Sequence, residues 1–162
     1  MKPRKPALKH EVLAAFGELK YPGHDRVLDP DCHPGRIDEV EDYLGREWHT
    51  LDDDFLQMHT EGLSFFSHEA FAYYLPAFLL HALQSTHHPG DADDALINAL
   101  DAGGPGSSRR AWQTARFNAM TQPQRHAVAK VLARIADKSA DGFDRQQAGR
   151  ALDRYWRKHL EQ

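Results

Sequence analysis

The sequence predicts an all-α protein, an irregular single-domain bundle of about seven helices around a central helix that is kinked at Pro76. Three observations support this fold class. Apolar residues recur at spacings of three and four in most segments, as on the buried face of a helix. Turn residues, mainly Gly, Pro and Asp, separate those segments. The alternation typical of strands is scarce, and only Arg26 to Asp29 has the character of an extended segment.

The first helix is expected from Ala7 to Leu19, after a flexible tail over residues 1–6. One side of this segment carries a continuous apolar stripe, which indicates a single buried face. From His24 to Gly35 the periodicity disappears, and two prolines and three aspartates predict a loop.

Two short helices follow this loop. The first is predicted from Arg36 to Leu44, with Gly45 as its C-terminal stop. The second is expected to begin after Thr50, because Thr50 and Asp53 resemble a capping box. It should end around His59 to Gly62.

The central helix is predicted from His68 to about Gln84, with Ser67 as its N-cap. Apolar residues surround it on nearly all sides, which places it in the middle of the domain. Pro76 lacks an N–H and crowds the carbonyl of Ala72, so we expect a kink.

Four further helices complete the prediction. A brief helix is capped at or next to Asp91, and the next one covers Arg109 to Met120. Thr121, with Pro123 and Gln124, is a strong start for the third. The last one is expected from about Arg145 to Leu160.

Length and composition indicate a protein that can fold without disulfides or bound metals. The chain has 162 residues, of which 41% are hydrophobic and 27% charged. Such a chain can bury roughly 70% of its unfolded surface. One cysteine excludes an internal disulfide, and no apolar run is long enough to cross a membrane. With no signal-peptide pattern at its start, the chain is expected to be cytoplasmic.

Charge divides the single domain of residues 7–162 into two parts. Residues 7–102 form an acidic part, residues 103–108 a Gly/Ser-rich loop, and residues 109–160 a basic helical part. Up to residue 106 there are 8 Lys and Arg against 19 Asp and Glu, a balance of −11. The remainder has 12 against 5, a balance of +7. The two parts either attract each other within the fold or present opposite faces to different partners.

A metal site is one functional hypothesis. His24, Cys32 and His33 share one loop, and imidazole and thiolate are the preferred ligands of zinc. No ligand spacing matches a known site, and the 11 histidines are scattered along the chain. We therefore expect no cofactor and keep a metal-dependent hydrolase as the alternative function.

The last predicted helix carries a basic stripe. Arg150, Arg154, Arg157 and Lys158 recur at helical spacing, which would attract phosphates. A net charge of −4 and the lack of a recognisable DNA-binding motif argue against nucleic acid as the partner.

The preferred hypothesis is protein recognition through an acidic face. Carboxylates are dense on the two short predicted helices, and acidic patches steer and hold basic partners without a catalytic centre. A small protein of this kind could be an immunity protein or antitoxin that blocks a basic toxin. The predicted partner-binding residues are Asp38, Glu39, Glu41, Asp42, Asp52, Asp53 and Asp54.

Several motifs resemble the DUF6714 family of uncharacterised small bacterial proteins. They are YPGHDRVL at 21–28, IDEVEDYLGREWHTL at 37–51, SFFSHEAFAYYLPAFLLHAL at 64–83, and FNAMTQPQRHAVAKVL at 117–132 followed by ALDRYW at 151–156. The resemblance spans most of the chain. It implies a common helical fold and transfers no catalytic residues.

Overall fold

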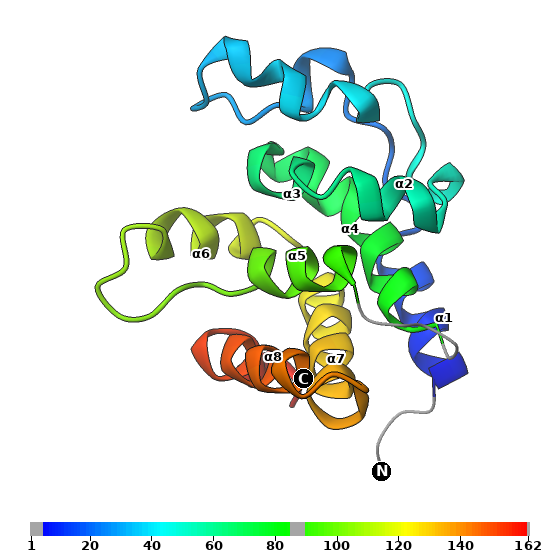
Figure 1. Cartoon of the computed structure of the whole chain (residues 1–162), viewed down its shortest axis with the longest axis vertical. Coiled ribbons are helices and arrows are strands. Elements are labelled where there is room, and N and C mark those ends of the chain that lie inside the picture. The colour runs from blue at the N-terminus through cyan, green and yellow to red at the C-terminus, as the bar shows by residue number, and fades with distance from the viewer. Residues whose placement is uncertain (1–4, 85–89, 162) are drawn as a thin grey trace.

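The structure consists of α-helices and short 3₁₀ helices arranged around helix α4, His68–Ala82 (Figure 1). It is a computed structural model that describes residues 5–84 and 90–161, without the side chains of residues 5 and 6. Within those ranges no strand occurs, and extended pairing is limited to an isolated bridge between Leu28 and Phe66. The predicted all-α class is confirmed.

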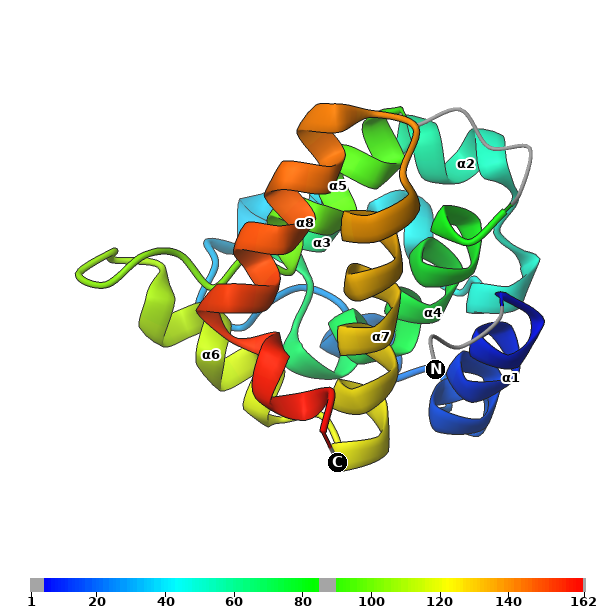
Figure 2. The same cartoon turned by 90° about the horizontal axis from the view of Figure 1, so that it is seen from below.

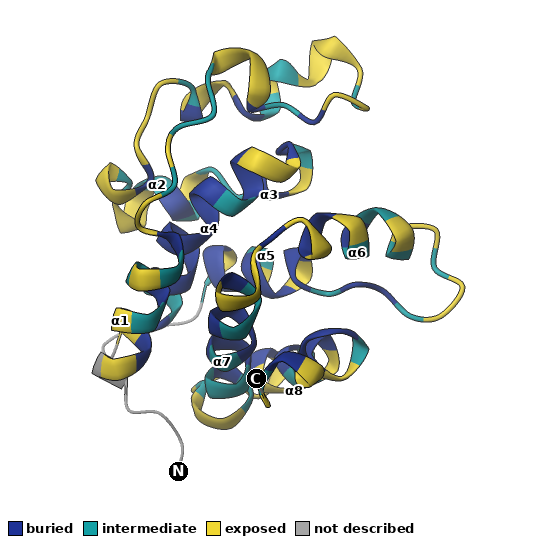
Figure 3. Ribbon diagram, turned by 180° about the vertical axis from the view of Figure 1, so that it is seen from behind, coloured by how far each residue is buried: buried dark blue, intermediate teal, exposed yellow. Residues whose placement is uncertain are grey.

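Helix α4 is the most enclosed element, as its composition predicts. The hydroxyl of Ser67 caps it by accepting the N–H of Ala70 at 3.0 Å. Phe71, Tyr74 and Phe78 are almost wholly buried, and Figure 3 shows the burial along α4 and the facing side of α7, Gln122–Lys138. The helix continues through Pro76. The kink expected there stays a prediction.

Helix α1, Lys5–Phe16, begins two residues before the predicted start and ends three residues before the predicted end at Leu19. Residues 1–4 of the predicted tail lie outside the described residues. Leu8, Val12 and Phe16 are buried, which confirms the predicted stripe. They face α4 and α7, and Figure 2 shows α7 between α1 and α8.

The helix predicted from Arg36 to Leu44 is instead two 3₁₀ helices, Pro34–Glu39 and Glu41–Tyr43. The backbone of Val40, at φ −122° and ψ 0°, interrupts them. Ile37, Val40 and Tyr43 recur every three residues, which matches the three-residue turn of a 3₁₀ helix. Two further 3₁₀ helices cover His24–Arg26 and Trp48–Thr50.

Helix α2, Asp53–Met58, is capped by Asp52 rather than by Thr50. The carboxylate of Asp52 accepts the N–H of Phe55 at 2.8 Å, whereas the hydroxyl of Thr50 donates to the carbonyl of Glu47 at 2.7 Å. A carboxylate is the better cap here because the positive end of the helix dipole favours negative charge. Helix α3, Gly62–Phe65, follows directly.

Helix α5, Asp91–Ala99, and helix α6, Arg110–Asn118, confirm two of the later predicted helices. The N–H of Gly90 before α5 donates to Asp93 at 3.1 Å. The start of α7 also agrees with the prediction. Gln124 accepts the N–H of Thr121 at 2.9 Å, and Thr121 accepts that of Gln124 at 3.3 Å.

The last predicted helix differs at both ends. Helix α8 covers Gly142–Arg154, and Asp141 caps it by accepting the N–H of Phe143 at 2.8 Å. Tyr155 has φ −153°, and a 3₁₀ helix, Trp156–His159, follows it. The side chains of Tyr155 and Trp156 are buried. The break between α8 and the 3₁₀ helix therefore coincides with the point where two aromatic rings enter the core.

Among the described residues, no helix is both long and apolar enough to cross a membrane.

Replacement of Gly62 by Ala should destabilise the fold. A Cβ at this position would lie 2.8 Å from both the Phe66 and Tyr43 rings, which are buried. Gly149 in α8 is the matched control, because a Cβ there would meet nothing within 4 Å. In urea unfolding, Gly62→Ala should lose about 1–3 kcal/mol. Gly149→Ala should gain roughly 0.5–1 kcal/mol from helix propensity. Equal stability of the two variants would contradict the tight packing of α3.

Candidate functional site

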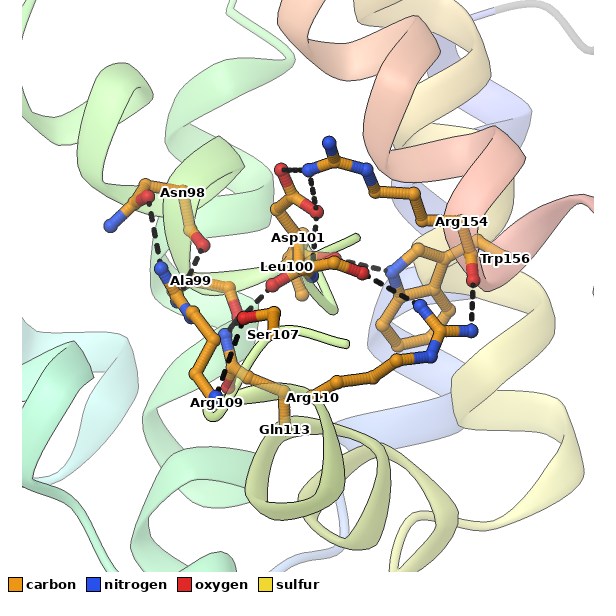
Figure 4. Close-up of polar contacts among 11 residues, drawn as sticks. Asn98, Ala99, Leu100, Asp101, Ser107, Arg109, Arg110, Gln113, Arg154 and Trp156 are labelled. Atoms are coloured by element: carbon orange, nitrogen blue, oxygen red, sulfur yellow. Dashed lines mark hydrogen bonds and ion pairs between the residues drawn. The ribbon is translucent and has the colours of Figure 1, made fainter. Parts of the chain in front are cut away.

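The C-terminal end of α5 is held by side chains from the basic part of the chain (Figure 4). Gln113 Nε2 donates to the carbonyl oxygens of Ala99 at 3.1 Å and Asp101 at 3.0 Å. The indole N–H of Trp156 donates to the carbonyl of Leu100 at 2.7 Å. The last carbonyls of a helix have no partner inside it, so these donors satisfy groups that burial would otherwise leave unpaired.

Two arginines complete the same junction. Arg154 Nη1 lies 2.8 and 3.0 Å from the two carboxylate oxygens of Asp101, which also accepts the N–H of Gly103 at 2.9 Å. Arg109 Nη2 donates to the carbonyl of Asn98 at 3.2 Å (Figure 4). Positive charge at a helix C-terminus is favourable because it opposes the helix dipole. The junction therefore joins the acidic and basic parts structurally.

Arg116 extends this junction into the core, where it is 1% exposed. Its guanidinium lies between the rings of Phe71, at 3.6 Å, and Trp112, at 4.4 Å. Its Nη atoms donate to the carbonyls of Leu63 at 2.7 Å and Ala99 at 3.1 Å, and burial lowers its pKa to about 9. A buried arginine that binds carbonyls and rings fixes α6 against α3, α4 and the end of α5.

Carboxylates of the predicted acidic face lie at opposite ends of α2. Asp42 lies against His59, with 3.3 Å between its carboxylate and the His59 Nδ1, and His59 ends α2. Asp52, Asp53 and Asp54 lie at the N-cap and first turn of the same helix. The sequence places all these carboxylates within 17 residues, but the fold separates them into two groups.

Several carboxylates of this face make contacts within the protein. Asp52 caps α2, and Asp53 Oδ1 lies 2.7 Å from Nδ1 of the buried His81. Glu39 pairs with Arg36 at 3.6 Å. Asp38, Glu41 and Asp54 are exposed and make no side-chain ion pair or hydrogen bond within the described residues.

The predicted metal ligands are not brought together as a set. His33 Nδ1 accepts the N–H of Gly35 at 3.0 Å and so caps a 3₁₀ helix. His24 Nδ1 lies 3.3 Å from the hydroxyl of Tyr21. Burial and the nearby Asp29 raise the pKa of the Cys32 thiol, which disfavours the thiolate that metals bind. In the described part of the chain, no three His, Cys, Asp or Glu side chains are placed to hold a metal ion.

The predicted basic stripe is not one helical face, because α8 ends at Arg154. Arg154 is bound to Asp101, and Arg157 pairs with Asp153 at 2.5 Å. Lys158 Nζ lies 4.5 Å above the ring of Tyr155. Arg150 is exposed on α8, before the break.

The two charged parts neutralise each other only locally. Within the described ranges, the ion pairs that join them are Glu11–Lys130, at 2.8 Å, and Asp101–Arg154, also at 2.8 Å. Where α5 meets α8, the carboxyl groups of Asp94 and Asp144 line the same hollow, and Asp94 helps to raise the pKa of Asp144. Much of the negative charge of the acidic part therefore remains on its surface.

A hollow of about 260 Å³ lies at this contact between α5 and α8. Its polar lining includes the carboxyl groups of Asp94, Asp101 and Asp144. The ring of Phe143 lines it too and is 64% exposed, which is unusual for so large an apolar side chain. We call this site the acidic hollow. No sequence motif marks it, because its lining comes from two helices that are distant in the chain.

Asp144 is the buried member of the acidic hollow, at 2% exposure. Burial, and then the hydrogen bond and charge of Asp94, raise the pKa of Asp144 to about 7. Asp141 and Asp93 add further negative charge nearby. A cation next to this carboxyl group would stabilise its ionised form.

The fold and these surfaces define a small all-α protein with an acidic hollow on its surface. A family model described as a family of unknown function, DUF6714, matches residues 32–160. The match covers more than half of the chain, so the protein belongs to this family, as the motifs predict. The motif at residues 21–28 lies outside the matched range. No curated protein and no solved structure matches the chain.

Removal of Arg116 should be strongly destabilising. Arg116→Ala would open a cavity between two rings and leave the Leu63 carbonyl without its donor. The expected loss is about 3–5 kcal/mol in urea unfolding. Arg150→Ala, on the exposed face of α8, should change stability by less than about 0.5 kcal/mol. A loss below about 1 kcal/mol for Arg116→Ala would show that the junction does not depend on this residue.

The raised pKa of Asp144 predicts a pH dependence of stability. The folded protein retains a proton that the unfolded chain releases near pH 4, so stability should fall as pH rises from about 4 to 7. Asp144→Asn removes this effect. The variant should be more stable than wild type by roughly 1–3 kcal/mol at pH 8 and similar to it near pH 4.

Urea unfolding across this pH range provides the measurement. Asp38→Asn is the control, because Asp38 is an exposed carboxylate outside the acidic hollow. Parallel pH profiles for wild type and Asp144→Asn would contradict the raised pKa.

Proposed function

We propose that this protein is a non-enzymatic binding module that recognises a basic surface of another protein. The acidic hollow is the observation that carries this proposal. It combines three carboxyl groups with the exposed ring of Phe143, and its volume of about 260 Å³ has room for one long side chain. Arginine and lysine bind well where charge attraction and an aromatic face are available together. The occupant we propose is such a side chain from the partner.

The exposed carboxylates outside the hollow have a second role in this proposal. Asp38, Glu41 and Asp54 have no internal partner in the described residues, so their charge is available to steer a basic protein toward the molecule. Glu39, Asp42, Asp52 and Asp53 belong to the predicted binding face as well. Each of those four also makes an internal contact, so we assign them a smaller share of binding.

An immunity protein or antitoxin that covers a basic toxin, in the cytoplasm, is the specific form that we propose for this activity. Its support is the charge of the acidic part, with 19 Asp and Glu against 8 Lys and Arg up to residue 106. Charge complementarity of this kind gives fast association and rejects partners of the wrong sign.

A titration with small cations tests the acidic hollow directly. We expect N-acetyl-L-argininamide to shift the backbone amide signals of residues 94–101 and 142–147 in ¹⁵N NMR spectra, and neutral N-acetyl-L-citrullinamide to leave them unchanged. Binding should be tighter at pH 8 than at pH 6, because the cation binds the ionised form of Asp144.

Two sets of variants locate the site. The double variant Asp94→Asn/Phe143→Ser should lose the shifts, whereas Asp38→Asn/Glu41→Gln/Asp54→Asn should keep them. If only the triple variant lost the shifts, the site would lie on the predicted acidic face instead. Equal shifts with citrullinamide would contradict a cation site.

The same variants test the partner itself. A protein that is captured by the wild type from its native cell, and that binds in purified form, should bind the double variant at least about tenfold more weakly. Unchanged affinity would contradict the proposal.

A further inference from the structure

A second hollow, of about 320 Å³, has the opposite charge. It lies between α6 and the end of α8 with the following 3₁₀ helix. Arg110, Arg154, Arg157 and Lys158 all contribute to its lining. Three of these residues belong to the predicted basic stripe. The fold therefore converts part of a linear pattern into a concave site, which we call the basic hollow.

Two of its four positive charges have no carboxylate partner among the described residues. Asp101 neutralises Arg154, and Asp153 neutralises Arg157. Arg110 instead donates to the carbonyls of Gly103, at 2.7 Å, and Arg154, at 3.2 Å.

Lys158 Nζ lies 4.5 Å above the Tyr155 ring and forms no ion pair with the described residues. The hollow therefore keeps an excess of positive charge after its internal contacts are counted. The C-terminal carbonyls of α8 carry partial negative charge, which would repel an anion. One of them, the carbonyl of Arg154, already accepts a hydrogen bond from Arg110.

A neutral donor accompanies this charge. Asn118 lines the hollow, and its side-chain oxygen accepts the hydroxyl of Tyr155 at 2.5 Å. This bond leaves the two N–H groups of the Asn118 amide as donors, with no acceptor in the described part of the chain. Oxygen-rich anions bind where cations and oriented N–H donors converge.

We propose that the basic hollow binds the phosphate group of a small phosphate ester. Lys158 and Arg110 supply the charge, and Asn118 donates a hydrogen bond. A volume of about 320 Å³ exceeds what a phosphate alone occupies and leaves space for part of the esterified group. The inference is independent of the acidic hollow and of any protein partner.

Nucleic acid fits this site less well than a small ester. Arg150, the remaining residue of the predicted stripe, does not line the hollow, so the basic surface is short. Asp153 also lines it and pairs with Arg157, so the unpaired positive charge is confined to Arg110 and Lys158. Tyr155 is only 7% exposed, so its ring offers no platform for stacked bases.

Calorimetric titration of the full chain tests the proposal. The probes are ribose 5-phosphate and AMP, with ribose and adenosine as matched controls without phosphate, and inorganic phosphate for the free anion. We expect the two esters to bind with Kd below about 1 mM and their dephosphorylated forms not to bind. Asn118 side-chain amide signals should shift in ¹⁵N NMR spectra. Tighter binding of inorganic phosphate than of either ester would contradict an ester site.

Two matched charge reversals locate the binding. Lys158→Glu should weaken ester binding at least about tenfold, whereas Arg150→Glu should weaken it less than twofold. Thermal unfolding of both variants confirms that they are folded. Equal losses in the two variants would overturn the proposal, because attraction would then be non-specific. So would an affinity for oligothymidine that increases with its length, since that result indicates a nucleic-acid surface.

Discussion

The capped C-terminal end of α5 is the constraint on which the rest of the structure depends. Three successive carbonyls, from Ala99 to Asp101, receive donors from Gln113, Arg116 and Trp156. These donors come from α6 and from the segment after α8, so one helix end fixes both elements. Each buried carbonyl would cost on the order of 1–3 kcal/mol if it lost its donor. Satisfying them together makes the acidic and basic parts one domain.

Asp101 connects the two hollows. Its carboxylate lines the acidic hollow and also binds Arg154, which lines the basic hollow. The ion pair joins the lining of a negatively charged hollow to that of a positively charged one. Opposite charges can persist close together because each side has groups that the pair does not neutralise, Asp94 on one side and Lys158 on the other.

The sequence predicted the elements better than the sites. Helices whose caps and apolar stripes agree, such as α4 after Ser67 and α7 after Thr121, were found with the correct starts. The 3₁₀ helices around Val40 were missed because spacings of three also fit one face of an α-helix. The break at Tyr155 depends on distant aromatic rings, Phe117 among them at 5.0 Å, so no local pattern predicts it. The acidic hollow was missed because Asp144 lies 50 residues after Asp94 in the chain.

The bond from the Trp156 indole to the Leu100 carbonyl has a consequence for synthesis. The acceptor is made 56 residues before its donor. While the chain grows, the carbonyl of Leu100 therefore lacks this donor until residue 156 has been added, long after the acidic part has emerged. Domains generally become stable as whole units when their last contacts form. A nascent chain of this protein should become resistant to protease abruptly, once residue 156 has left the ribosome.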